Sequence, residues 1–178
     1  MSPWVALLRG VNVGGIAIRS ADLADLFRDT LGFTEVRTFL ASGNVRFETD
    51  AATRTRPALK SSIEQALRER FGYDAWIVLV TLAELERAIE KFPFDDGDDA
   101  RQPWVVFCVD AATRDELAEA AASVDRTVDP VATGRGVVYW NPPKGSSTDT
   151  AFAKVLAKAA YKSRTTNRNL RTLVKIAA

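Results

Sequence analysis

The sequence predicts an α+β protein made of two similar β-α-β-β-α(-β) halves. Short apolar runs alternate with amphipathic stretches along the chain, a pattern typical of strands and helices in turn. The pattern of the first 80 residues returns in the remainder, although the letters themselves do not repeat. At 178 residues the chain is long for one small domain and short for two ordinary ones. We therefore expect subdomains at 1–80 and 81–178 that together form one domain.

The first half alternates strands and helices. Trp4 to Leu8 is apolar on both faces, as expected of a central strand, while Leu59, Ile63 and Leu67 recur at helical spacing. The expected elements, in order, are a strand at 4–8, a helix from 20 to 32, strands at 36–40 and 45–48 around a tight turn, a helix from about 59 to 72, and a strand at 76–80. This is the ferredoxin-like order β-α-β-β-α-β.

The second half repeats this order up to its last strand. Its expected elements are a helix with a capping box at Thr81 and Glu84, a strand at 104–109, a helix with a capping box at Thr113 and Glu116, a hairpin at 127–140 and a helix at about 152–159. A short helix from about Asn167 to Ile176 takes the place of the final strand. The prediction is thus two ferredoxin-like halves packed as one compact body.

The composition excludes several classes of function. The chain has no histidine, which excludes a Ser-His-Asp triad, a Cys-His pair and a histidine-based zinc site. The single cysteine, Cys108, excludes an internal disulfide and is expected to be a small hydrophobe within a strand. The net charge of +1 gives no global field for nucleic acid or membrane. We expect no metal and no cofactor.

The N-terminus indicates a cytoplasmic protein. Met-Ser-Pro-Trp lacks the positive segment of a signal peptide, and no apolar run approaches the ~20 residues that a membrane helix needs. We therefore expect no membrane partner. The pattern leaves the oligomeric state open.

Two glycine-containing stretches form the candidate binding site. RGVNVGG, residues 9–15, follows the first strand, and ASGN, residues 41–44, joins the next two. In a sheet of order 4-1-3-2, the end of strand 1 lies beside the start of strand 3, so topology brings both stretches to one edge. Glycines can expose consecutive backbone amides, so this edge favours an anion. The candidate ligand-binding residues here are Arg9, Gly10, Asn12, Gly14, Ser42, Gly43 and Asn44.

A second interpretation of these stretches is purely structural. The glycines would then serve chain geometry, and Asn44 would cap a turn. The spacing of Gly10, Gly14 and Gly15 excludes a G-x-G-x-x-G dinucleotide fingerprint, and no Gly-Lys-Ser/Thr follows to make a Walker loop.

Four stretches together resemble one known family. ALLRGVNVGG at 6–15, the segment at 22–47 with its SGN turn, ERFGYDAWIVL at 69–79, and a Thr-x-Arg-Asn-x-x-Thr motif at 166–172 are similar to the bacterial domain-of-unknown-function 1697 family. The resemblance implies an α+β fold with ferredoxin-like subdomains and no established activity, substrate or cofactor. This sequence departs from the family at Leu170, where a tryptophan is common, so this position has no aromatic ring for stacking.

The C-terminal motif adds Thr166, Arg168 and Asn169 to the candidate ligand-binding residues. One interpretation is a capped closing helix with Thr166 or Asn167 at its N-cap. The other is that Arg168 and Asn169 fold back onto the glycine-containing edge and complete one polar pocket.

These observations lead to four functional hypotheses. The first is a binding module for an anionic small molecule that bears phosphate or carboxylate. The second is nonspecific nucleic-acid binding through a basic C-terminal lobe, in which phosphates would contact Arg135, Lys144, Lys162, Arg164, Arg168 and Arg171. The third is an enzyme without histidine, for which no catalytic pair is evident. The fourth is an interaction protein that self-associates through a sheet edge or an exposed face.

Overall fold

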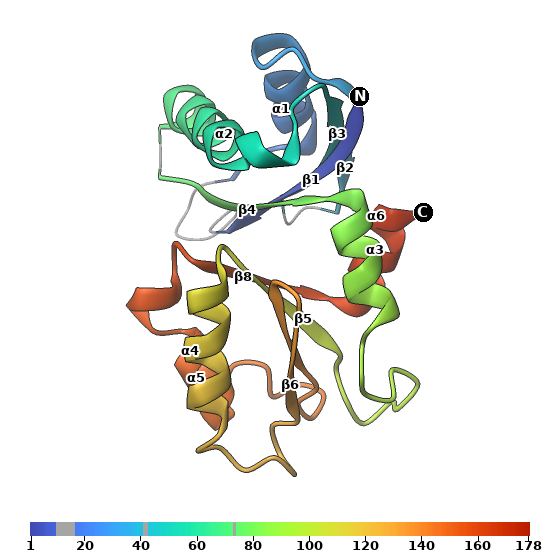
Figure 1. Ribbon diagram of the computed structural model, residues 1–178, viewed down its shortest axis with the longest axis vertical. Helices are drawn as coiled ribbons and strands as arrows, with labels where there is room; N and C mark the ends of the chain where they lie inside the picture. The colour runs from blue at the N-terminus through green and yellow to red at the C-terminus, as the bar shows by residue number, and fades with distance from the viewer. Residues whose placement is uncertain (10–16, 41–42, 73) are drawn as a thin grey trace. The chain divides into compact units, whose positions relative to one another are not determined.

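The computed structural model describes residues 1–9, 17–40, 43–72 and 74–178. Within these residues, the strands form two four-stranded antiparallel sheets with helices (Figure 1). The predicted α+β fold with two similar halves is confirmed, and each half has a sheet of its own, a point that the sequence pattern left open. The chain divides into a first unit, Met1–Leu85 with Lys175–Ala178, and a second unit, Glu86–Val174. The first unit therefore holds both ends of the chain.

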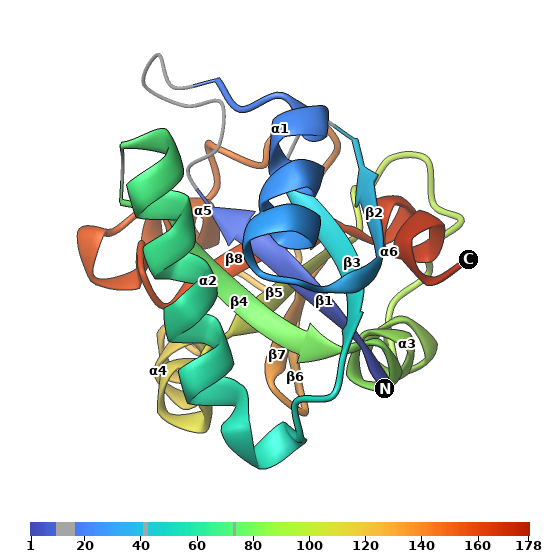
Figure 2. The same cartoon turned by 90° about the horizontal axis from the view of Figure 1, so that it is seen from above.

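The first unit has the predicted β-α-β-β-α-β order. Its elements are β1 (Ser2–Arg9), α1 (Ser20–Asp25) extended by a π-helical turn (Leu26–Thr30), β2 (Thr34–Phe39), β3 (Asn44–Thr49), a 3₁₀ turn (Thr53–Thr55), α2 (Arg56–Phe71) and β4 (Trp76–Thr81). The strand order is β2-β3-β1-β4, and β1 is antiparallel to both β3 and β4. Helices α1 and α2 cover one face of this sheet (Figure 2).

Aromatic side chains fill the core beneath α1 and α2. The rings of Phe33 and Phe47 stack with their centroids 4.5 Å apart, and Phe27 meets Phe47 edge-on at 5.3 Å. Trp4 from β1 and Ile63 from α2 belong to the same cluster. This packing fixes the positions of β1 and β3, the two strands that carry the candidate edge.

Two helix ends follow the sequence prediction. Gly72 ends α2 in the left-handed conformation, with φ of 70°. The capping box at the start of α3 (Leu82–Glu90) is confirmed, because the Thr81 amide donates to Glu84 Oε2 at 2.9 Å and the Glu84 amide donates to Thr81 Oγ1 at 3.2 Å.

The second unit repeats the order of the first. Its further elements are β5 (Trp104–Cys108), α4 (Ala111–Ala121), β6 (Val131–Gly134), β7 (Val137–Trp140), α5 (Ala151–Leu156), a 3₁₀ turn (Ala159–Tyr161), β8 (Thr165–Asn169) and α6 (Leu170–Ala177). The strand order is β6-β7-β5-β8. A core of side chains from β5, β6 and β7 lies against α4 and α5.

The last strand of the second half is present, so the prediction that a helix replaces it is wrong. β8 pairs antiparallel with β5 at five successive positions, from Cys108 opposite Thr165 to Trp104 opposite Asn169. The segment Thr-Thr-Asn-Arg-Asn has no apolar alternation, and backbone pairing with β5 holds it in place instead. Helix α6 begins only at Leu170, after the strand.

The predicted capping box of Thr113 and Glu116 is also wrong. Asp110 is the N-cap of α4, and its Oδ1 accepts hydrogen bonds from the amide of Thr113 at 2.8 Å and from its hydroxyl at 2.7 Å. Glu116 instead binds Arg164 through both carboxylate oxygens at 3.0 Å. The chain leaves β5 and enters the helix three residues earlier than the sequence pattern indicates.

Candidate anion-binding edge

The end of β1 and the start of β3 are neighbours. The amide of Leu8 donates to the carbonyl of Gly43 at 2.9 Å, and Leu7 lies opposite Asn44 in the β1–β3 register. Gly43 has φ of 75°, a left-handed conformation that glycine adopts without steric cost. The last residues of β1 and Gly43, which precedes β3, therefore lie at the same edge of the sheet.

Arg9 is the last residue of β1 and lies opposite Trp76 of β4. Its side chain is partly buried, and this burial lowers the pKa of the guanidinium below its ordinary value. A lowered arginine pKa means that the charged form is less well solvated than in water.

Asn44 is a buried polar residue of the hairpin. It is 1% exposed, and its Nδ2 donates to the carbonyl of Phe39 at 2.9 Å across the β2–β3 pair. The side-chain amide thus stabilises the turn, as the structural interpretation of this residue predicts.

The other candidates of the two glycine-containing stretches, Gly10, Asn12, Gly14 and Ser42, lie outside the described residues. The described part of the edge consists of Arg9, Gly43 and Asn44, with Trp76 of β4 opposite Arg9.

The three candidates of the C-terminal motif lie on β8, in the second unit. Arg168 is 8% exposed, and its Nη1 donates to Thr166 Oγ1 at 2.6 Å and to the Asn167 carbonyl at 2.9 Å. Asn169 Oδ1 accepts from the amide of Arg171 at 2.9 Å and so caps the start of α6. The N-cap prediction of Thr166 or Asn167 is therefore wrong, because Asn169 has that role.

The second unit has an equivalent edge. The amide of Cys108 at the end of β5 donates to the carbonyl of Gly136 at 3.0 Å, and Gly136 also has φ of 75°. Phe107 lies opposite Val137 here, as Leu7 lies opposite Asn44 in the first unit. The sequence signal for this equivalence is weak, but a tryptophan, Trp4 or Trp104, lies in the first half of each central strand.

A polar cluster of its own occupies the edge of the second unit. Arg164 Nε donates to Thr113 Oγ1 at 3.0 Å in addition to its two bonds with Glu116. These bonds with Glu116 raise the pKa of Arg164 and lower the pKa of Glu116. The Arg164 side chain also lies 5.7 Å from the ring centroid of Tyr161.

These contacts reduce the basic surface expected for nucleic acid. Of the six cations in that hypothesis, Arg164 binds Glu116 and Arg168 is buried against its own strand. Arg135, Lys144, Lys162 and Arg171 remain exposed. Fewer accessible cations mean fewer phosphate contacts.

The thiol and the acidic side chains of the described residues were two further candidates for chemistry. Cys108 is 7% exposed, and burial raises the pKa of its thiol to about 12, so it is protonated at neutral pH. Among the described residues no group of three acidic or cysteine side chains is placed to hold a metal ion. No helix in the described ranges has the length and hydropathy needed to cross a membrane.

The fold places the protein among α+β proteins that consist of two similar halves, each with a four-stranded antiparallel sheet. A solved structure of this class, that of conserved bacterial protein SP0830 from Streptococcus pneumoniae, matches with a TM-score of 0.80 and 23% identity, over 99% of this chain and 97% of that chain. At this level of identity the likeness shows the fold alone.

Residues 1–139 match the family described as "Protein of unknown function (DUF1697)", and the chain belongs to this family. The matched range includes both glycine-containing stretches and ends in β7, before the Thr-x-Arg-Asn motif. No curated protein matches the sequence.

Proposed function

We propose that the protein is a binding module for an anionic small molecule that bears a phosphate or carboxylate group. The ligand would bind at the edge where β1 ends and β3 begins. The observation that supports the proposal is the hydrogen bond from Leu8 to Gly43, since it joins the end of β1 to the residue that precedes β3.

Arg9 supplies the charge in this proposal. Its guanidinium is partly withdrawn from water, so an anion gains more from it than from a fully solvated arginine. Gly43 allows a ligand to approach the backbone, and Asn44 stabilises the hairpin on which Gly43 lies. The donors of Gly10, Asn12, Gly14 and Ser42 enter the proposal from the sequence alone.

The motif residues Thr166, Arg168 and Asn169 have contacts within the second unit that account for their positions. The proposal therefore rests on the first unit. Arg168 and Asn169 stay secondary candidates, whose substitution should change ligand binding less than that of Arg9.

The test compares two arginine substitutions in the first unit. Arg9→Gln removes the charge at the edge, whereas Arg54→Gln removes an exposed charge from the 3₁₀ turn before α2. Thermal unfolding of both variants and of the wild type is measured with inorganic phosphate, nucleotides and phosphorylated sugars. A compound present at about 100 times its Kd stabilises the native state by about 2.7 kcal/mol.

We expect at least one phosphate-bearing compound to raise the Tm of the wild type and of Arg54→Gln, but not that of Arg9→Gln. The proposal fails if no compound distinguishes the two variants. A nucleic-acid surface would give a different result, because affinity for a single-stranded oligonucleotide falls steeply with salt and depends on several cations.

A further inference from the structure

We propose that β6 of the second unit binds an extended acidic peptide as an added strand. This site is separate from the anion site proposed on the first unit. The proposal combines three observations on the described residues: an edge strand with outward-facing backbone groups, a hollow on each face of that strand, and unpaired cations at both hollows.

The backbone of β6 presents hydrogen-bonding groups at the edge of the sheet. The β6–β7 hairpin has a two-residue turn, so Gly134 and Val137 form a hydrogen-bonded pair. Pairs alternate along an antiparallel ladder, so Ala132 also bonds to β7, whereas the amides and carbonyls of Val131 and Thr133 point away from it. Among the described residues, no second strand pairs with β6 and no group hydrogen-bonds to these four.

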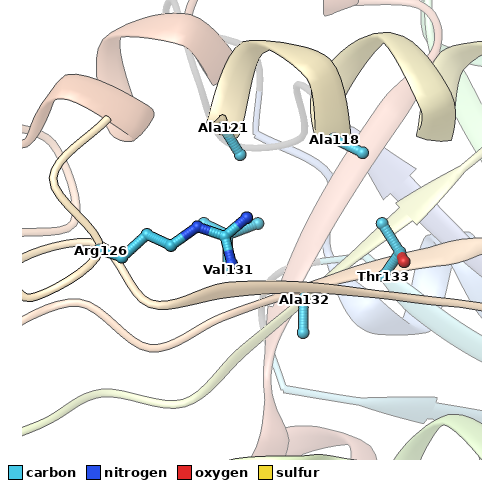
Figure 3. Close-up of a pocket in the computed structure, with 6 residues that line it drawn as sticks. All are labelled: Ala118, Ala121, Arg126, Val131, Ala132 and Thr133. Atoms are coloured by element: carbon cyan, nitrogen blue, oxygen red, sulfur yellow. The ribbon is translucent and has the colours of Figure 1, made fainter. Parts of the chain in front are cut away.

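The first hollow lies between β6 and α4. It has a volume of about 430 Å³, with Ala118 and Ala121 of α4 on one side and Val131 and Thr133 of β6 on the other. Figure 3 shows the Arg126 side chain extended into this space above Val131, while Ala132 points to the opposite side of the strand. The small alanines leave room for an incoming side chain.

The second hollow lies on the opposite face of β6. Val138 belongs to the core beneath α4 and α5, so its neighbour Tyr139 faces the other side of the sheet. There the Tyr139 hydroxyl donates to the carbonyl of Ala88 in α3 at 2.9 Å. A hollow of about 140 Å³ surrounds this contact, and its cationic lining residues are Arg87, Lys91 and Arg135.

The tip of β6 is shaped by this contact. A Cβ atom at Gly134 would lie 2.7 Å from a ring carbon of Tyr139. The Tyr139 ring therefore packs directly against the backbone of Gly134, and only glycine fits at this position. The second hollow therefore has a fixed wall beside the outward-facing groups of Thr133.

The charges at both hollows are unbalanced. Among the described residues, Arg126 at the first hollow and Arg87, Lys91 and Arg135 at the second have no hydrogen bond or ion pair with an acidic side chain. Lys91 directly follows α3, and its amide donates to the carbonyl of Arg87 at 3.0 Å, so these two cations lie one turn apart. The acid nearest Arg126 in sequence, Asp125, instead accepts bonds from Thr127.

The exposed backbone of β6 and the cations beside it together favour an acidic peptide as the added strand. Successive side chains of a strand point to opposite faces, so a strand paired with β6 would place one side chain in each hollow. Acidic side chains would meet an unpaired cation on either face. A second copy of this edge would bring the same flanking cations, Arg126 and Arg135, to the interface, and this like charge disfavours self-association through β6.

The test uses two synthetic, fluorescein-labelled peptides of equal charge. The first, the glutamate peptide, alternates one valine with two glutamates. The second, the proline peptide, has a proline in place of each valine, so it cannot form a continuous strand. Fluorescence anisotropy measures the binding of each to the full chain. We expect the first peptide to bind with a Kd below about 1 mM and the proline peptide to bind at least about tenfold more weakly.

Two substitutions at one position separate strand addition from simple charge attraction. Thr133→Pro removes an outward-facing amide without breaking the β6–β7 ladder, and Thr133→Ala keeps that amide. We expect Thr133→Pro to weaken binding at least about tenfold, and Thr133→Ala to change it less than about twofold. Arg126→Glu and Lys91→Glu should each weaken binding of the acidic peptide at least about tenfold.

Hydrogen exchange on the wild-type protein provides a readout that needs no variant to fold. The peptide should slow exchange of the Val131 and Thr133 amides and leave that of Ala132 unchanged. Three results would each overturn the proposal. The glutamate peptide could fail to bind, or the two Thr133 variants could bind it equally well. A single-stranded oligonucleotide could also bind more tightly than the peptide, with an affinity that Thr133→Pro does not change.

Discussion

The amide of Leu8 donates a hydrogen bond of 2.9 Å to the carbonyl of Gly43, and this bond joins the end of β1 to the start of β3. The second unit has the same bond between Cys108 and Gly136. Each unit therefore has its own copy of this backbone junction, and the side chains around the two copies differ. Arg164 and Glu116 form an ion pair at the second junction, whereas Arg9, which is partly buried, ends β1 at the first.

Replacement of either junction glycine by alanine should destabilise the protein. Gly43 and Gly136 both have φ of 75°, where alanine is strained, so each substitution should lower the free energy of unfolding by about 1 kcal/mol. A Cβ at Gly136 meets no atom within 4 Å, so its cost comes from backbone strain alone. Urea unfolding measures both values.

The same pair of variants tests the proposed site. Gly43→Ala should also abolish the stabilisation by a phosphate-bearing ligand, while Gly136→Ala should retain it. An equal loss of ligand response in both variants would place the anion elsewhere.

Strands with an apolar pattern were predictable from the sequence, and β8 was not. Trp4 to Leu8 lies in the centre of a sheet and is fully buried, as its apolar run predicts. The β8 segment offers Thr165 and Thr166 as its only β-branched residues, and they are flanked by asparagine and arginine. Its conformation depends on a partner strand about sixty residues earlier, which local periodicity does not reveal.

In the candidate site, too, some features were predictable from the sequence and others were not. The adjacency of β1 and β3 follows from strand order, so it was predictable once the elements were recognised. The burial of Asn44 and Arg168 was not, because it depends on how each hairpin and strand packs in three dimensions. Asp110 and Thr113 are both capping residue types, and only the path of the chain out of β5 decides between them.

Two buried tryptophans should respond differently to phenylalanine. Trp140 Nε1 donates to Asp129 Oδ1 at 2.8 Å, whereas Trp4 Nε1 has no hydrogen-bond partner among the described residues. Both side chains are fully buried, so the loss of apolar contact is similar. Trp140→Phe leaves a buried carboxylate oxygen without this donor and should cost about 1–3 kcal/mol more than Trp4→Phe.

Urea unfolding followed by circular dichroism measures this difference. Asp129 Oδ2 also accepts from the Phe152 amide at the start of α5, so Trp140→Phe should loosen that helix as well. Equal costs for the two variants would show that the bond to Asp129 adds nothing to stability.

The Cys108 thiol should be unreactive in the folded protein. Burial raises its pKa to about 12, so at pH 8 its thiolate fraction is about a thousandfold lower than that of an ordinary cysteine. A chromogenic disulfide reagent should therefore label the native protein very slowly and the urea-unfolded protein at the rate of a free thiol. Rapid labelling of the native protein would contradict the burial of this strand.

The cap of α4 should make stability depend on pH. Bonds from Thr113 hold the pKa of Asp110 below its ordinary value, so the charged cap stabilises the fold above about pH 4, the unfolded pKa, and this contribution is lost as pH falls through the folded pKa. Asp110→Ala should lower the free energy of unfolding by about 1 kcal/mol at pH 7, and less at pH 2. Asp110→Asn keeps a neutral cap at every pH, so its stability should fall less than that of the wild type between pH 4 and 2. Urea unfolding across this range decides the matter, since parallel curves for wild type and Asp110→Asn would mean that the Asp110 charge contributes nothing.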